Sequence, residues 1–311
     1  MAKASAIDCK PKKQASSSDN GTAYYKAVRE FWDSSPDKTI NERRLTLAYH
    51  DELTKHHLAD NLMRFRRHLL LSQSAMAGLL HVSLSQYKKY ESGQEIMRYD
   101  VAMRLSLKCG LPNFCLLRGS PYADYIPLPA EYVGFDRVWF YANTLTDTYF
   151  NRLCQVLACF IDTPFTPATL KSGVTIEDFD GALAESEDRI YLAIAQGIRA
   201  LRDHLGFSQE YVAECMDVSL SRYQEYERAT TRPRFNLLVA ARYGIAMGIN
   251  PFHVLVGTKF AKVRTMQNAR IAAIQEIVQH VDDDTIHSFM PMVEGFYSSV
   301  KNLPNAIYFA V

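Results

Sequence analysis

The 311-residue sequence contains no apolar run that approaches the roughly 18 residues needed to cross a lipid bilayer. Its first 21 residues also lack the apolar centre of a secretory signal peptide, and they carry Lys, Ser, Gln and Asp instead. We therefore expect a disordered leader at residues 1–21, no association with a membrane, and a cytoplasmic protein.

Patterns typical of metal, cofactor and catalytic sites are equally scarce. The six cysteines show neither C-x-x-C nor C-x-x-C-H spacing, which favours buried, reduced thiols. There is no Gly-rich phosphate loop, no H-E-x-x-H and no G-x-S-x-G. His56 and His57 lie near Asp51 and Glu52, but adjacent histidines on a helix point apart. The sequence predicts no catalytic residue, no metal site and no cofactor.

What the sequence does contain is an internal repeat. Residues 82–91 read VSLSQYKKYE, and residues 218–227 read VSLSRYQEYE. The same offset aligns residues 59–98 with residues 195–234. More than a dozen of these positions are identical, where unrelated sequences give roughly two or three. The chain is also long enough for about two domains, each with its own core.

Each repeat reads as two short helices joined by a corner. Ser72 and Ser83 stand at positions typical of N-caps, because a serine hydroxyl accepts a backbone N–H of the first turn. Only His81 and Val82 separate the two helices of the first repeat, which leaves room for a tight turn alone. This arrangement is a helix-turn-helix. A helix such as residues 83–91 fits the major groove of B-form DNA and would present a polar, basic face to it.

The pattern Ser-Gln, Ala four residues after Gln, Val-Ser and then Glu-x-Gly resembles the Cro and CI-type helix-turn-helix family of phage and bacterial regulators, the XRE family. The resemblance covers about 60 residues in each copy. It implies an all-α fold with two lambda-repressor-like helix-turn-helix domains plus additional helices. It also implies recognition helices at residues 83–91 and 219–227.

The resemblance further implies which side chains touch DNA. Gln73 and Gln209 would bond a phosphate, the exposed positions of the recognition helices would face the bases, and the loops that follow would touch phosphate again. The DNA-binding residues implied in this way are Gln73, Ser83, Leu84, Ser85, Lys88, Lys89 and Arg98 in the first copy, and Gln209, Ser219, Leu220, Ser221, Arg222, Gln224, Glu225, Arg232 and Arg234 in the second.

Two features depart from the family pattern. The usual turn glycine is His81 in one copy and Asp217 in the other, and both residue types tolerate the left-handed backbone conformation better than most. The glycine after the recognition helix is present as Gly93 but is replaced by Ala229. The second loop therefore departs from the family pattern.

The net charge of +1 over the whole chain indicates no anionic partner, so the position of the charges matters more. Residues 59–98 carry six Lys and Arg against three Asp and Glu, whereas residues 195–234 carry six of each. The first copy should therefore bind phosphate more strongly. Glu225 stands where Lys89 does, and its carboxylate must pair with a cytosine amino group or a neighbouring arginine.

Two further carboxylates are expected to be structural. Glu91 should bond Arg66 across the helices of the first copy, and Glu227 should bond Arg202 in the second.

Five segments follow from these patterns. Two C-terminal stretches, about 259–281 and 283–300, have helical apolar stripes that either complete the core of the second domain or pair with another chain. We expect a leader at 1–21, a first helix-turn-helix domain with N-terminal helices at 22–121, a connector and linking helix at 122–185, a second helix-turn-helix domain at 186–258, and C-terminal helices for packing or dimerisation at 259–311.

The favoured function is a sequence-specific regulator of transcription, bacterial or phage, that binds double-stranded DNA through two unequal helix-turn-helix units. Such a protein would associate with the nucleoid when bound. The alternative is a protein-interaction factor that contacts RNA polymerase or another regulator through the same fold, and a homodimer through the C-terminal helices is open in either case. Neither alternative is an enzyme.

Overall fold

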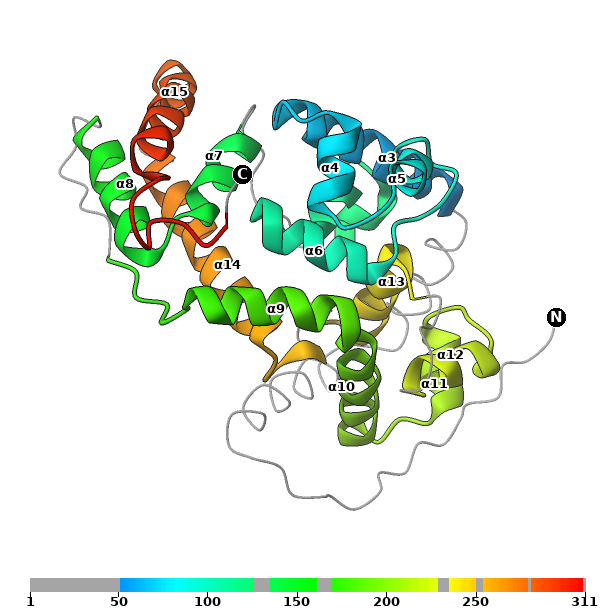
Figure 1. Cartoon of the computed structure of the whole chain (residues 1–311). Coiled ribbons are helices and arrows are strands. Elements are labelled where there is room, and N and C mark those ends of the chain that lie inside the picture. The colour runs from blue at the N-terminus through cyan, green and yellow to red at the C-terminus, as the bar shows by residue number, and fades with distance from the viewer. Residues whose placement is uncertain are drawn as a thin grey trace. The chain divides into compact units, whose positions relative to one another are not determined.

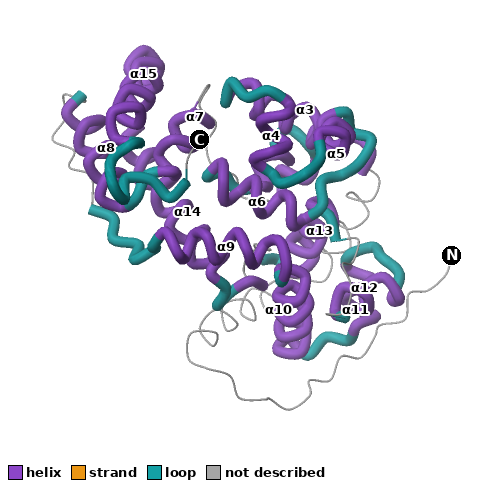
Figure 2. The backbone as a smooth tube through the Cα atoms, in the orientation of Figure 1, coloured by secondary structure: helices purple, strands orange, loops and turns teal. Residues whose placement is uncertain are grey.

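In a computed structural model, the protein is described at residues 51–125, 135–160, 169–228, 235–249, 254–278 and 281–309. These residues form helices and no strand, apart from isolated bridges such as the antiparallel one between Leu145 and Ile307, so the expected all-α class is confirmed (Figure 2). The described residues divide into a small unit, Asp51 with those of 190–256, and a large unit, those of 52–189 with those of 257–309. The leader lies outside the described residues.

Four helices build the described part of the small unit. Ser208, Ser219 and Asn236 each cap a helix by accepting a backbone N–H, and the last helix ends at Gly248 in the left-handed conformation. Their apolar faces meet in a core that includes Ile198 and Tyr223. The helices are α10 (Ile190–Leu205), α11 (Gln209–Cys215), α12 (Leu220–Glu227) and α13 (Leu237–Met247).

The large unit begins with the first repeat. Its helices are α3 (Asp51–His68), α4 (Gln73–Leu79), α5 (Leu84–Glu91) and α6 (Tyr99–Cys109), followed by the 3-10 helix η1 (Asn113–Leu117). Almost every residue of α6 is buried, because α7, α9 and α14 pack against it as well as η1. Gly110 ends α6 with a φ of 75°, a conformation that glycine adopts without steric cost.

The other helices of the large unit come from the centre and the C-terminus of the chain. They are the 3-10 helix η2 (Pro121–Tyr125), α7 (Phe135–Thr144), α8 (Asp147–Cys159), α9 (Ile176–Asp188), α14 (Lys259–Val278) and α15 (Asp283–Val300). The long helix α14 packs against α6, α7, α8 and α9, and α15 packs against α7 and α8 (Figure 1). The apolar stripes of α14 and α15 are therefore buried within the unit that contains the first repeat.

Several local expectations need correction. The Pro- and Tyr-rich sequence at 120–135 predicts an extended connector, but its residues 121–125 form the 3-10 helix η2. The sequence also predicts Asp60 as the cap of a helix at 61–71, but α3 runs through Asp60 without a break. Helical spacing predicts that Val156 and Phe160 share a buried stripe of the linking helix, but both are exposed. By contrast, the acidic residues at 282–284 predict the start of a helix, and this is confirmed: Asp282 accepts the Thr285 N–H at 2.8 Å. None of the described helices is long and apolar enough to cross a membrane.

Candidate nucleic-acid interface

In the small unit, α11 and α12 are joined by a tight turn that contains a residue in the left-handed backbone conformation. The Ser208 hydroxyl accepts the Tyr211 N–H at 3.1 Å, and the Ser219 hydroxyl accepts the Arg222 N–H at 3.2 Å, so each helix has a fixed start. Between them, Asp217 has a φ of 54°, which confirms that this residue takes the place of a turn glycine. The direction of α12 relative to α11 is thus set by the backbone itself.

A carboxylate at the end of α12 fixes the helix to its neighbours. Arg202 Nε donates to Glu227 Oε1 at 2.5 Å, Arg202 Nη2 donates to Oε2 at 3.0 Å, and Gln209 Nε2 donates to Oε2 at 2.7 Å. The Glu227 side chain is only 1% exposed. Its burial raises the pKa, but the hydrogen bonds from Arg202 and Gln209 outweigh burial and hold the pKa below its ordinary value. The expected Arg202–Glu227 pair is confirmed.

The outer face of α12 carries the side chains that the sequence analysis assigned to DNA. Ser219 and Ser221 are exposed, and Leu220, Arg222, Gln224 and Glu225 are half-buried. Arg222 Nη1 donates to Glu225 Oε2 at 2.6 Å, which confirms that a neighbouring arginine pairs with the Glu225 carboxylate. Arg232 and Arg234 lie outside the described residues.

The large unit contains the same set of features. Ser72 and Ser83 cap α4 and α5 by accepting the N–H groups of Ala75 and Gln86, at 3.0 and 3.1 Å. His81 occupies the corner with a φ of 53°, as expected of a glycine substitute.

Glu91 is held by the same types of residue as Glu227. We call each set of an arginine, a glutamate and a glutamine the clamp: Arg66, Glu91 and Gln73 here, and Arg202, Glu227 and Gln209 in the small unit. Arg66 Nε donates to Glu91 Oε1 at 2.9 Å, and Arg66 Nη2 lies 2.8 Å from the same oxygen. Gln73 Nε2 donates to the other oxygen, Oε2. The expected Arg66–Glu91 pair is confirmed. Gln73 and Gln209, assigned above to phosphate, therefore each donate to a buried carboxylate.

The outer face of α5 is more basic than that of α12. Ser83, Leu84, Ser85 and Lys88 are exposed. Arg98 begins the next helix and forms a two-pronged bond with Asp100, at 3.0 and 2.6 Å, so its guanidinium is held at the edge of this face.

One residue on this face was not singled out from the sequence. Glu95, in the loop after α5, accepts Lys89 Nζ and Gln86 Nε2, both at 2.8 Å. These bonds hold the pKa of the Glu95 carboxyl below its ordinary value. No local pattern predicts such a pair, because it depends on how the loop folds back over the helix.

No group of three His, Cys, Asp or Glu side chains that could hold a metal ion occurs among the described residues. The geometry of both corners instead presents a short helix with a polar outer face, held at its far end by a buried ion pair. This arrangement can place side chains against a base edge or a phosphate but offers no nucleophile activated by a base.

Comparison with known proteins agrees with the geometry of the small unit. A family model described as Helix-turn-helix matches residues 198–241, which span α11, α12 and the adjoining parts of α10 and α13. No curated protein and no solved structure matches the chain. The match supports a helix-turn-helix of the Cro/CI type at residues 198–241.

Proposed function

We propose that the protein is a sequence-specific regulator of transcription that binds double-stranded DNA through two tandem helix-turn-helix units, with α5 and α12 as recognition helices. The observation that carries the proposal is the recurrence, around α5, of the complete framework of the family-matched domain. Both repeats have two serine caps, a non-glycine residue at a positive φ in the corner, and an Arg–Glu–Gln clamp. A duplication of the domain accounts for all of these at once.

The clamp gives each recognition helix a rigid orientation. Glu91 and Glu227 close the C-terminal ends of α5 and α12, so the N-terminal turns, with Ser83 and Ser219, remain free to enter a major groove. The proposed contacts are those named in the sequence analysis, with base edges read from the helices and phosphates bound by the flanking residues.

The two helices would read different bases. On α12, Arg222 matches the acceptors of guanine, and Glu225 beside it accepts from a cytosine amino group. On α5, Lys88 and Lys89 favour guanine and phosphate. A single chain with two unequal helices binds a non-palindromic site, in contrast to a symmetric pair of identical chains.

The chain organisation follows from the same proposal. The large unit would hold the first DNA-binding repeat within a helical scaffold completed by α14 and α15, and the small unit would hold the second. The organism of origin would be a bacterium or a phage, where regulators with this domain are found.

The decisive experiment compares two double variants in a gel-shift assay with DNA recovered from cells together with the protein. Lys88→Ala with Lys89→Ala removes two charges from α5, and we expect at least a tenfold loss of affinity, since each phosphate or base contact contributes about 1 kcal/mol or more. Lys171→Ala with Lys301→Ala removes two exposed charges elsewhere and should have little effect. Equal binding by both variants would contradict the role of α5.

The second candidate function is a protein-interaction factor, and the neutral face of α12 favours it. Arg222 is already paired with Glu225, so this helix attracts phosphate less than α5 does. If the wild-type chain recovers no enriched DNA but recovers a subunit of RNA polymerase or another regulator, and Glu225→Lys abolishes that recovery, the protein-interaction function is the correct one.

A further inference from the structure

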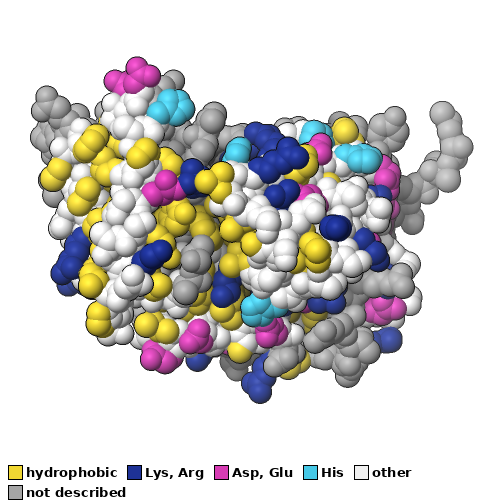
Figure 3. All heavy atoms as spheres, turned by 45° about the horizontal axis from the view of Figure 1, so that its top comes forward, with side chains coloured by type: hydrophobic (Ala, Val, Ile, Leu, Met, Phe, Trp, Pro, Cys, Tyr) yellow, Lys and Arg dark blue, Asp and Glu magenta, His cyan; other side chains and the backbone are white. Residues whose placement is uncertain are grey.

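The first turn of α5 presents an exposed leucine between two serines. Leu84 is 40% exposed, and Ser83 and Ser85 beside it are exposed as well. Figure 3 shows hydrophobic side chains exposed at many places on the surface, so exposure alone gives Leu84 no role. The features that call for an explanation are its position on the helix and its recurrence in the other repeat.

The local structure of α5 does not require a leucine at this position. A helix start is stabilised by the N-cap, here Ser83, and by an apolar pair that joins the residue before the cap to the fourth residue of the helix. In α5 these two positions are Val82 and Tyr87, and Tyr87 is fully buried. Leu84 belongs to neither pair, so a polar residue there would leave both in place.

Two of the polar side chains that follow Leu84 are already bonded. Gln86 and Lys89 both donate to Glu95, at 2.8 Å. Lys88 is exposed and lies one turn after Leu84, on the same side of the helix. The outer face of α5 therefore combines an apolar group at its start with a cation one turn later.

The second repeat has the same leucine but different polar residues after it. Residues 82–85 and 218–221 both read Val-Ser-Leu-Ser, so Leu220 occupies the place of Leu84. Leu220 is likewise the first residue of its helix, after a serine cap, and it is half-buried. The next four residues are Gln-Tyr-Lys-Lys in α5 and Arg-Tyr-Gln-Glu in α12. The polar groups thus differ between the two helices, whereas the apolar group is common to both.

The major groove of DNA offers one apolar group to a leucine at the start of a recognition helix. This group is the 5-methyl group of a pyrimidine, which thymine and 5-methylcytosine carry, whereas the other bases present hydrogen-bonding groups there. Burial of one methyl group against an apolar side chain raises affinity about fourfold.

We propose that Leu84 contacts the 5-methyl group of a pyrimidine, so that the binding of DNA by α5 depends on that methyl group. The inference rests on the proposed function, because it requires α5 to lie in a major groove. It adds a chemical feature of the DNA site that the charges of Lys88 and Lys89 do not specify.

Synthetic duplexes test the inference by fluorescence anisotropy with the full chain, in a sequence that the chain enriches from a random library. Replacing thymine by uracil, one position at a time, removes a 5-methyl group and leaves every hydrogen-bonding group in place. Methylating one cytosine at a time adds the same group. We expect a loss of about fourfold with uracil at one position if thymine is the source, or a gain of about fourfold at one cytosine if 5-methylcytosine is.

Leu84→Ala assigns the methyl group to this side chain. The variant shortens an exposed residue, so it should fold as the wild type does, which circular dichroism verifies. It should bind the parent duplex about fourfold more weakly or worse, and the modification that changes the affinity of the wild type should no longer change its own. Leu303→Ala, at a leucine that is 46% exposed outside the repeat, is the matched control and should respond to the modification as the wild type does.

The outcomes separate this inference from the proposed function. If the wild type binds the duplex but no single 5-methyl group changes its affinity, Leu84 reads no methyl group, and only this inference fails. The same holds if Leu84→Ala remains as sensitive as the wild type at every position. If the chain enriches no duplex at all, the proposed function fails and the inference fails with it.

Discussion

Arg202 donates to both carboxylate oxygens of Glu227, through Nε and Nη2, whereas Arg66, at the same place in the other repeat, approaches one oxygen of Glu91 with the same two nitrogens. Each arginine comes from the long helix that precedes the two short ones, α10 or α3, and each carboxylate ends the second short helix, α12 or α5. The same arginines also donate to the carbonyl oxygens of Phe207 and Leu71 at the start of the following loop. One guanidinium thus joins the long helix, the loop and the second short helix.

The first prediction concerns the stability supplied by this clamp. Glu227→Ala leaves Arg202 charged and largely buried, with only the exposed carboxylate of Asp203 as an acidic partner, so the free energy of unfolding of the small unit should fall by about 3–5 kcal/mol. Urea unfolding followed by circular dichroism measures this. Glu225→Ala, at an exposed pair on the same helix, should change it by less than about 1 kcal/mol. Similar losses in both variants would mean that Glu227 does not stabilise the fold through its burial.

The second prediction follows from the lowered pKa of Glu227. The folded value lies below the ordinary value of 4.5, so the ionised clamp contributes its full stability above that pH and loses it as the pH falls through the folded value. Glu227→Gln has no titrating group at this position. The difference in unfolding free energy between wild type and Glu227→Gln should therefore be constant at neutral pH and shrink below pH 4.5. A difference that grows on acidification would contradict the assignment.

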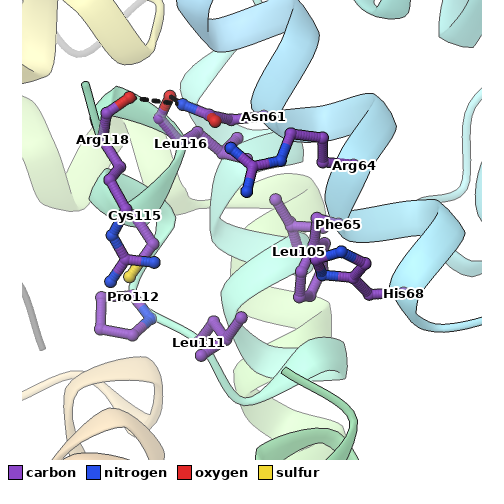
Figure 4. Close-up of a pocket in the computed structure, with 10 residues that line it drawn as sticks. All are labelled: Asn61, Arg64, Phe65, His68, Leu105, Leu111, Pro112, Cys115, Leu116 and Arg118. Atoms are coloured by element: carbon purple, nitrogen blue, oxygen red, sulfur yellow. Dashed lines mark hydrogen bonds between the residues drawn. The ribbon is translucent and has the colours of Figure 1, made fainter. Parts of the chain in front are cut away.

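The Arg–Glu pair, the corner and the serine caps of each repeat could be predicted from the sequence because each depends on residues at short, fixed spacing that recur in the two repeats. The glutamines were assigned to phosphate instead, and their bonds to Glu91 and Glu227 were not predicted. Glu95 could not be predicted either, since its contact with Lys89 depends on the path of a loop. The same holds for the small cavity lined by Asn61, Leu105 and Arg118 (Figure 4), because these residues meet only when α3, α6 and the following loop are packed.

The C-terminal helices illustrate a second limit of sequence analysis. Apolar spacing predicted α14 and α15 but left open what they cover, since a helical stripe does not identify its partner. The structure packs them against α7, α8 and α9. Arg264 and Arg270 lie within the buried part of α14, where a pattern of apolar residues gives no reason to place a cation.

The third prediction concerns Glu95, which neutralises Lys89 beside the exposed Lys88. Glu95→Gln removes a negative charge from the face of α5 and releases Lys89, so the affinity for any duplex should rise several-fold. The slope of log affinity against log salt concentration should become steeper by about one, the value expected for one additional phosphate contact. Fluorescence anisotropy at several salt concentrations measures both. Glu52→Gln is the matched control, because Glu52 is an exposed partner of Lys55 outside the recognition face. An unchanged salt dependence in Glu95→Gln would show that Lys89 does not meet phosphate.

The fourth prediction concerns the fully buried Arg270 of α14. Its Nη1 donates to the carbonyl oxygens of Ala142 at 3.2 Å and Leu145 at 2.6 Å, and its Nη2 donates to Asp147 at 2.9 Å. The guanidinium also lies 4.6 Å from the ring centre of Phe150. Arg270 therefore joins the end of α7 to the start of α8, and burial lowers its pKa although Asp147 opposes this.

Arg270→Ala would remove a donor from two buried carbonyl oxygens, would leave the Asp147 carboxylate with only its bonds from Ser172, and would open a cavity beside Phe150. The free energy of unfolding of the large unit should fall by about 3–5 kcal/mol, which calorimetry detects as a lower unfolding temperature. Arg152→Ala on the surface of α8 is the control and should cost less than about 1 kcal/mol. Because both variants lose one arginine, a general effect of charge would lower both temperatures equally, and only the loss of the buried bonds separates them.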